Sequence, residues 1–109
     1  SITGKTFIAE LKDNVIKEYT IRPSLFKLKE GNLKDIVVED SSHSKKMILD
    51  ILNGKLSVGR DIALLNAGAA IYISGLVNDI DSGIMIAADM IDQGKAMEKL
   101  NQLITSSND

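Results

Sequence analysis

A nearly unbroken apolar segment, GRDIALLNAGAAIYISG at positions 59–75, decides how this chain is built. The segment predicts a helix in which Asp61 is the N-cap, accepting from the free backbone donors of the first turn, and Gly75 is the end. This helix has no continuous polar face, and a helix that is apolar nearly all round has to be enclosed by other protein. The rest of the chain offers only a few short elements for that purpose. We therefore expect the segment to lie inside something larger than these 109 residues.

Two segments before this helix have the alternating pattern of a β-hairpin. Apolar and polar residues alternate over 6–11 and again over 15–21, and Asp13-Asn14 between them is a turn signal. Pro23 ends the second strand because it lacks the amide hydrogen that a strand ladder needs. A hairpin alone is marginally stable, so it needs a sheet or a helix as partner.

The remaining residues predict one more short strand and three more helices. Residues 25–32 indicate a loop or a single helical turn that ends at Gly31, and 35–38 indicate a short third strand. Because the strands precede the helices, we expect an α+β arrangement for the isolated chain, and not a complete doubly wound α/β domain. The first of these helices is capped by Ser41 or Ser42, ends at Gly54 and has the apolar face Met47, Ile48, Ile51 and Leu52. The second runs from Asp79 or Asp81 to Gly94 and has the apolar face Ile84, Ala87, Ala88 and Ile91. The third runs from Lys95 to about Ile104 and has the apolar face Ala96, Leu100, Leu103 and Ile104.

The composition excludes several classes of protein. A net charge of −2 and a pI near 5.3 argue against a nucleic-acid binder, which usually displays a basic face. Without cysteine the chain has no disulfide, thiolate metal site or thiol nucleophile, and we expect a cytoplasmic location. The apolar run 62–73 is too short to span a bilayer and is interrupted by Asn66. We expect a single fragment over 1–109 with a flexible tail at 106–109.

No group of residues forms a catalytic arrangement, so we predict no catalytic, cofactor-binding or metal-binding residue in this chain. His43 lies at a helix start, where the helix dipole disfavours its protonation, and we interpret it as a solvated residue without a role. Asp79, Asp81, Asp89 and Asp92 offer the carboxylate oxygens that Mg²⁺ prefers. Their positions fit helix capping and a solvent-facing surface better.

Five positions on the predicted helices need a separate explanation. Arg60-Asp61 could bind an anion at the start of the apolar helix, but a capping Asp61 would occupy the same backbone donors. Gly68 and Gly83 lie inside helices, where Gly costs about 1 kcal/mol relative to Ala, so each predicts a close approach of another helix or strand. Asn66 lies on a helix expected to be buried, and we predict a hydrogen bond to a neighbouring backbone, with a ligand contact as the weaker alternative.

Three segments of the chain follow one another in the order and spacing of a known family. They are EYTIRPSLFKL at 18–28, the apolar helix at 59–75 and IDQGKA at 91–96. Together they resemble the C-terminal portion of the anthranilate phosphoribosyltransferase family, which is glycosyltransferase family 3. The departures from the family pattern are Val38-Glu39-Asp40 in place of Gly-Gly-Asp, Ser44 in place of Asn, and Leu25 and Lys27 in place of the Asp and Gly of a turn.

The resemblance implies a parent enzyme of tryptophan biosynthesis. Such an enzyme transfers phosphoribosyl from phosphoribosyl pyrophosphate to the amino group of anthranilate and releases pyrophosphate with the help of Mg²⁺, and it is a homodimer. The family's Gly-Thr-Gly-Gly-Asp phosphate loop, Lys-His-Gly-Asn-Arg substrate motif and Asp-Glu metal pair have no counterpart in 1–109, and that pair lies just upstream of the position of Ser1. The chain is thus expected to be the C-terminal part of the parent's α/β domain. We expect it to be inactive alone and to bind no cofactor, nucleic acid or membrane.

A second interpretation, from a different class, is a stand-alone α+β binding or interaction module without catalysis. It would fold as a stable monomer without any upstream sequence. The apolar flank of the central helix argues against it, because an isolated chain that exposes such a flank should associate. A third interpretation is a nucleoside phosphorylase of the same superfamily, which the three segments fit less well.

Overall fold

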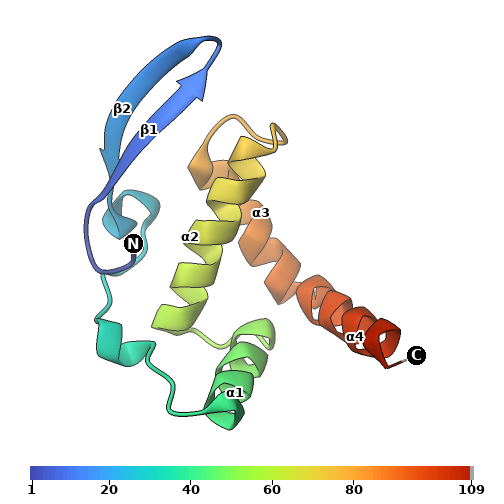
Figure 1. The fold of residues 1–109 in the computed structure, drawn as a ribbon. Coiled ribbons are helices and arrows are strands. Elements are labelled where there is room, and N and C mark those ends of the chain that lie inside the picture. Colours follow the sequence, from blue (N-terminus) through green and yellow to red (C-terminus); the bar gives the residue numbers. More distant parts are fainter. Residues whose placement is uncertain (109) are drawn as a thin grey trace.

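The computed structural model describes residues 1–108 and begins with the predicted β-hairpin (Figure 1). β1 (Thr6–Lys12) pairs antiparallel with β2 (Val15–Ile21). Asp13 and Asn14 at the turn have positive φ angles of 52° and 62°, as the tightest hairpin turns require. The hairpin is therefore confirmed together with its turn residues.

Two short 3₁₀ helices connect the hairpin to the helical part. The first, η1 (Pro23–Phe26), begins at the buried Pro23 and is followed by the C-cap residue Lys27, whose φ is 59°. It supplies the helical turn expected within 25–32, although it begins earlier and does not end at Gly31. Lys27 adopts the left-handed conformation, at a cost of about 1–2 kcal/mol for a residue with a side chain.

The predicted third strand at 35–38 is wrong. The second 3₁₀ helix, η2 (Leu33–Asp35), occupies the start of this segment, and residues 36–38 have no regular structure. The Asn32 amide donates to the Asp35 carboxylate at 3.2 Å, and the Asp35 amide donates to the Asn32 carbonyl at 3.0 Å. These local hydrogen bonds close a turn and compete with an extended strand.

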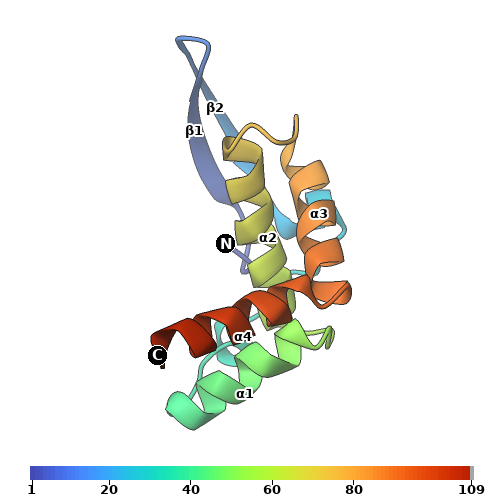
Figure 2. The same cartoon turned by 90° about the vertical axis from the view of Figure 1, so that its right-hand side faces the viewer.

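Four helices make up the rest of the described chain, and with the hairpin they confirm the α+β class (Figure 2). Among residues 1–108, none of the helices is both long and apolar enough to cross a membrane. The last helix includes two residues of the tail expected at 106–109, and Asp109 lies outside the described residues. The bounds are α1 (Ser41–Leu52), α2 (Val58–Ile73), α3 (Ile80–Asp92) and α4 (Lys95–Ser107).

The N-caps of two helices differ from the prediction. Ser41 and Ser42 lie within the first turn of α1, and Asp61 lies within the first turn of α2, so none of them is a cap. The reason is geometric, because a cap keeps an extended backbone and accepts from an amide two or three residues later. Asp79, one of the two alternatives for α3, is confirmed. The observed caps and the amides that they accept from are Asp40 with His43 at 2.7 Å, Ser57 with Arg60 at 3.0 Å and Asp79 with Ser82 at 2.7 Å.

The core forms where α2 crosses α3, and two glycines make this crossing possible. A Cβ atom at Gly83 would lie 2.2 Å from the Gly68 carbonyl oxygen, and one at Gly68 would lie 2.4 Å from Cγ1 of Ile84. Both distances are far below van der Waals contact, so the helices approach backbone to backbone. The close approach predicted for both glycines is thereby confirmed. The buried side chains around the crossing are Leu64, Leu65, Ile84, Ala87 and Ile91.

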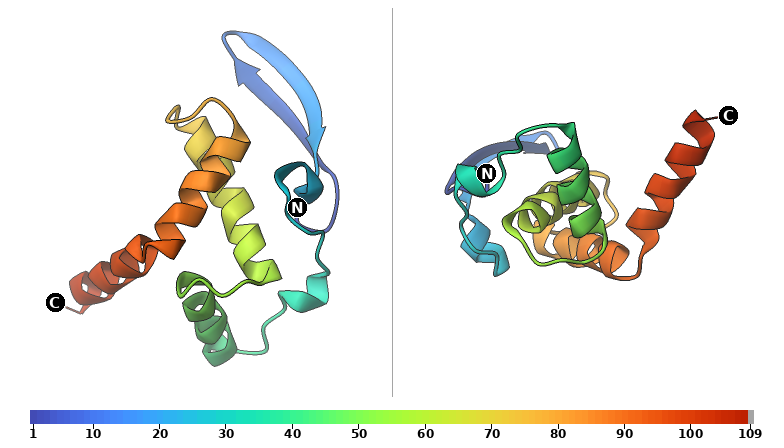
Figure 3. Two further views of the ribbon diagram at one scale, coloured as in Figure 1. Left: turned by 180° about the vertical axis from the view of Figure 1, so that it is seen from behind. Right: turned by 90° about the horizontal axis from the view of Figure 1, so that it is seen from below.

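The fold is open, with much of its apolar surface uncovered. The Cα radius of gyration is 15.4 Å, whereas a compact domain of this length has about 13 Å. α4 extends away from the other helices (Figure 3), and its predicted apolar residues Leu103 and Ile104 are exposed. Only the α3 side of α2 is well covered, and Ile73 near its end is exposed. The enclosure expected for α2 is thus incomplete within the described residues.

Replacing Gly83 by Ala should destabilise the chain although Ala is the better helix former. The new methyl group would meet the rigid Gly68 backbone, and overpacking of this kind costs about 1–3 kcal/mol. Gly59→Ala is the control, because its methyl group would lie 3.1 Å from the flexible tip of Ile51. Urea denaturation followed by circular dichroism measures both changes. Equal effects of the two substitutions would contradict the close helix crossing.

Candidate functional site

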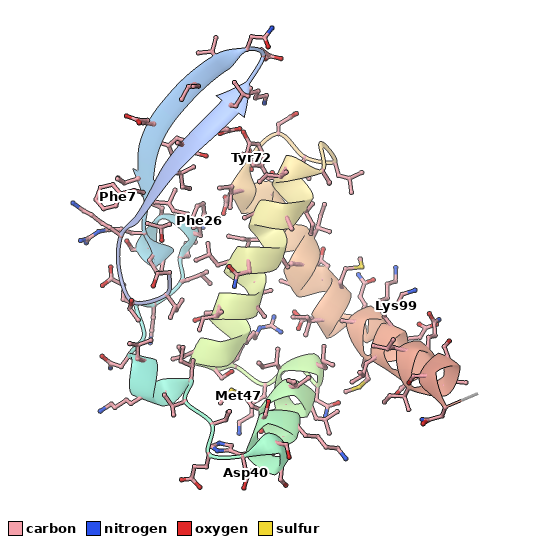
Figure 4. The ribbon with its side chains drawn as sticks, in the orientation of Figure 1. Phe7, Phe26, Asp40, Met47, Tyr72 and Lys99 are labelled. Carbon is pink, nitrogen blue, oxygen red and sulfur yellow. The ribbon has the colours of Figure 1, made fainter. Side chains whose placement is uncertain are left out.

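A carboxylate and two phenols join the hairpin to α2. Glu10 of β1 accepts a hydrogen bond from the Tyr19 hydroxyl of β2 at 2.9 Å through Oε2. The Tyr72 hydroxyl, near the end of α2, donates to the other oxygen of the same carboxylate. In Figure 4, Tyr72 lies at the end of α2 that is nearest the hairpin. We call Glu10, Tyr19 and Tyr72 the hairpin clasp.

Strand alternation explains how two of these residues come to the same face. Tyr19 pairs with Ile8 across the hairpin, and Glu10 follows two positions after Ile8, so all three side chains lie on one face. All three are partly buried, whereas Ala9, which lies between Ile8 and Glu10 in β1, is exposed. The inner face of the hairpin is therefore the face that meets α2.

The electrostatics of the clasp favour an ionised carboxylate between two neutral phenols. The hydrogen bond from Tyr72, followed by that from Tyr19, lowers the pKa of Glu10. Burial first and the Glu10 carboxylate second raise the pKa of Tyr19 to about 12. The hydrogen bond to Glu10 also raises the pKa of Tyr72. None of the three groups changes protonation near neutral pH, so the clasp is suited to hold structure and not to transfer protons.

A largely apolar cavity of about 550 Å³ lies beside the clasp, between the hairpin and the end of α2. The Lys12 ammonium sits 5.6 Å from the centre of the Tyr72 ring. The carboxylate of Glu10 accepts one hydrogen bond on each oxygen from a phenol, and these two bonds fix its orientation at the edge of the cavity. Apolar side chains that line the cavity are Ile8, Ala9, Leu11, Ala69, Ile73, Val77 and Ile80.

A second polar contact connects the start of α2 to the end of α3. Arg60 is buried, its Nη2 donates to Asp92 Oδ2 at 3.1 Å, and its Nη1 lies 3.0 Å from Oδ1. The guanidinium is therefore paired within the chain, and the Ser57 cap accepts from the Arg60 amide. Burial raises the pKa of neighbouring Asp61. The anion site considered at Arg60-Asp61 thus has neither a free cation nor a free first turn.

The four aspartates considered for Mg²⁺ do not converge. Asp79 caps α3 and Asp92 pairs with Arg60, while Asp81 and Asp89 are exposed. Within residues 1–108, no three His, Cys, Asp or Glu side chains come close enough together to hold a metal ion. Among the described residues, the acidic side chains are therefore not gathered in the way that a magnesium site requires.

His43 and Asn66 are both exposed. The predicted exposure of His43 is confirmed, and its Nδ1 accepts from the Glu39 amide at 3.3 Å. The prediction of a buried Asn66 is wrong, because this side chain lies on the part of α2 that α3 does not cover. Neither residue belongs to the clasp or to the Arg60–Asp92 pair.

Loss of the Arg60 partner should destabilise the chain. Asp92→Asn would leave the buried guanidinium without a countercharge, and we expect a loss of about 1–3 kcal/mol, less than for a fully buried pair because the Asp92 carboxylate is half-exposed. Asp89→Asn on the same helix is the matched control and should cost less than about 0.5 kcal/mol. The free energy of unfolding in urea measures both. If the two variants have the same stability, the Arg60–Asp92 pair contributes nothing.

Removal of one phenol should release the hairpin without unfolding it. Tyr72→Phe breaks the bond between α2 and Glu10, whereas Tyr19→Phe breaks only a bond inside the hairpin. We expect faster hydrogen exchange of the amides of β1 in Tyr72→Phe while the amides of α3 stay unchanged. Exchange measured by mass spectrometry compares the two variants.

The stabilisation that the hairpin clasp provides should decrease as the pH falls. Because the folded chain lowers the pKa of Glu10, the stabilisation is present above the unfolded pKa and is lost as the pH falls through the folded value. Acid should therefore release β1 in the wild-type chain and have less effect in Tyr72→Phe. Identical acid sensitivity of both proteins would contradict the role of Glu10.

Comparisons with known proteins place these features in a family. A family model described as "Glycosyl transferase family, a/b domain" matches residues 1–97. The protein named anthranilate phosphoribosyltransferase from Methylobacillus flagellatus is 44% identical over 103 residues, which are 94% of this chain and 30% of that protein. The proteins of the same name from Polynucleobacter necessarius and Vesicomyosocius okutanii are 39% and 43% identical over 107 residues, or 98% of this chain.

The chain spans about a third of the length of these relatives, 30–32% in the three cases. It therefore corresponds to a fragment of such a protein, as the resemblance of 18–28, 59–75 and 91–96 predicts. By its match over 1–97 and these identities, the chain belongs to the glycosyl transferase family with the a/b domain.

Proposed function

We propose that this chain is the C-terminal structural part of an anthranilate phosphoribosyltransferase and that the catalytic groups lie in the preceding part. The observation that carries this proposal is the similarity to proteins of that name, which covers 94–98% of the chain but only 30–32% of each relative. The whole enzyme would transfer phosphoribosyl from phosphoribosyl pyrophosphate to anthranilate and would release pyrophosphate.

The contacts among the described residues support a structural role of this chain in the parent enzyme. Arg60 and Asp92 neutralise each other, and Glu10 is held by two tyrosines, so these charged groups are used within the fold. Mg²⁺, where the parent enzyme uses it, would stabilise the charge of the leaving pyrophosphate. Residues 1–108 hold no cluster of acidic side chains that could ligate this ion. We assign the chain a structural role, which is to stabilise the α/β domain.

The proposal extends to the setting of the parent enzyme. We propose phosphoribosyl pyrophosphate and anthranilate as its substrates, a homodimer as its assembly and the cytoplasm as its location. The printed names of the relatives support the substrates. The dimer follows from the family resemblance, and the absence of cysteine is compatible with the cytoplasm.

A chimeric enzyme tests the proposal. This chain replaces the matching C-terminal part of the Methylobacillus flagellatus protein, and mass spectrometry measures phosphoribosyl anthranilate formed from both substrates with Mg²⁺. We expect product from the chimera and none from the 109-residue chain alone. The Methylobacillus protein cut before the matching part is the control and should also be inactive.

Two outcomes would contradict the proposal. Product from the free chain would contradict its lack of catalytic groups. A folded chimera without product would contradict the assignment to this enzyme, and a free chain that is also a stable monomer would then favour a stand-alone binding module.

A further inference from the structure

The hairpin carries apolar side chains on both of its faces. The inner face meets α2 through the clasp. On the opposite face, Phe7, Leu11 and Ile16 are 82%, 71% and 71% exposed. The register pairs Leu11 with Ile16 and Phe7 with Thr20, so these side chains lie on one face. We call this the outer face, and its six residues are Phe7, Ala9, Leu11, Ile16, Glu18 and Thr20.

The large apolar side chains of the outer face are mostly exposed, although Ala9 and Leu11 also border the cavity between the hairpin and the end of α2. Figures 1 and 3 show the helices gathered on one side of the hairpin, and in Figure 4 Phe7 points to the other side. Leu11 and Ile16 lie opposite each other near the turn, and Phe7 lies at the other end of the same face, with Ala9 and Glu18 between them. Exposed apolar side chains gathered on one face are typical of a surface that other protein covers. The two-stranded sheet also leaves one edge of each strand unpaired.

The chemistry of the outer face limits what can cover it. Glu18 is the one charged residue among its six, and it is negative. A surface of this kind has no cation to attract nucleic acid or an anionic lipid headgroup. It fits an apolar protein surface, and in α/β domains both faces of the sheet are covered by such layers.

We infer that the outer face of the hairpin is the surface on which the preceding part of the same α/β domain packs. This inference rests on the proposed function, because it takes the relatives' remaining length as the source of the second layer. The matching family model describes an a/b domain, and the chain spans only 30–32% of the three relatives. About two thirds of each relative is therefore available to supply that layer. The resemblance places this part before Ser1.

A cysteine reporter tests the inference, since the chain has no cysteine of its own. Ala9→Cys places a small thiol in the middle of the outer face. The variant is made in the chimera with the Methylobacillus flagellatus protein, whose own cysteines are replaced by serine. The rate of labelling by a thiol reagent is compared between the native and the urea-denatured chimera. Lys99→Cys on the exposed polar side of α4 is the matched control, and Ala87→Cys in the core reports folding.

We expect Cys labelling at position 9 to be slowed about tenfold or more in the native chimera, and labelling at position 99 to be nearly unchanged. Fast labelling at 9 with slow labelling at 87 would overturn the inference, because the domain would be folded with the outer face open. Fast labelling at positions 9 and 87 would also overturn the inference, because the preceding part would then fail to pack on this chain. In the free chain, slow labelling at 9 together with dimeric sedimentation would identify a second copy as the occupant instead.

The same chimera separates this inference from the proposed function. Product formation with fast labelling at position 9 would keep the function and overturn the packing surface. Slow labelling without product would keep the packing surface and contradict the function.

Discussion

Backbone meets backbone where α2 crosses α3, and the positions of the other elements follow from this contact. At Gly68 and Gly83 a single methyl group would fall within 2.4 Å of atoms of the other helix. The absence of side chains lets the two helices bring Leu64, Leu65 and Ile84 together in one core. The buried Arg60 then pairs with the half-exposed Asp92, and this ion pair joins the start of α2 to the end of α3. The hairpin is attached to this pair through Glu10 and Tyr72.

The close crossing also explains why the fold is open. Once α3 occupies the glycine side of α2, the other side of this nearly apolar helix has nothing in residues 1–108 to cover it fully. The outer face of the hairpin and the last turns of α4 are uncovered in the same way. A complete small domain would normally bury such surface. The exposed residues and the length of the relatives lead to the same conclusion, namely that the described part is one portion of a larger α/β domain.

Local patterns predict much of this fold, and contacts between distant residues account for most of what they miss. Alternation and turn residues are enough for the hairpin, and Gly68 and Gly83 indicate the helix crossing because glycine inside a helix needs a reason. The third strand at 35–38 fails because Asn32 and Asp35 close a turn through hydrogen bonds that composition does not reveal. The partners of Arg60 and Tyr72 lie 32 and 62 residues away in the sequence, so no periodicity points to them. Strand register alone could have brought Glu10 and Tyr19 together. The predicted burial of Asn66 fails because the described chain does not enclose α2 on that side.

The most direct test of the account is the intact mass of the protein produced from its native gene. We predict a mass far above the 11.8 kDa of these residues, because the uncovered faces of α2 and of the hairpin need further protein to cover them. A mass equal to 11.8 kDa in a stable, monomeric protein would contradict it. The uncovered faces would then belong to a complete protein, and the chain would be a stand-alone binding module with the fold of this C-terminal part.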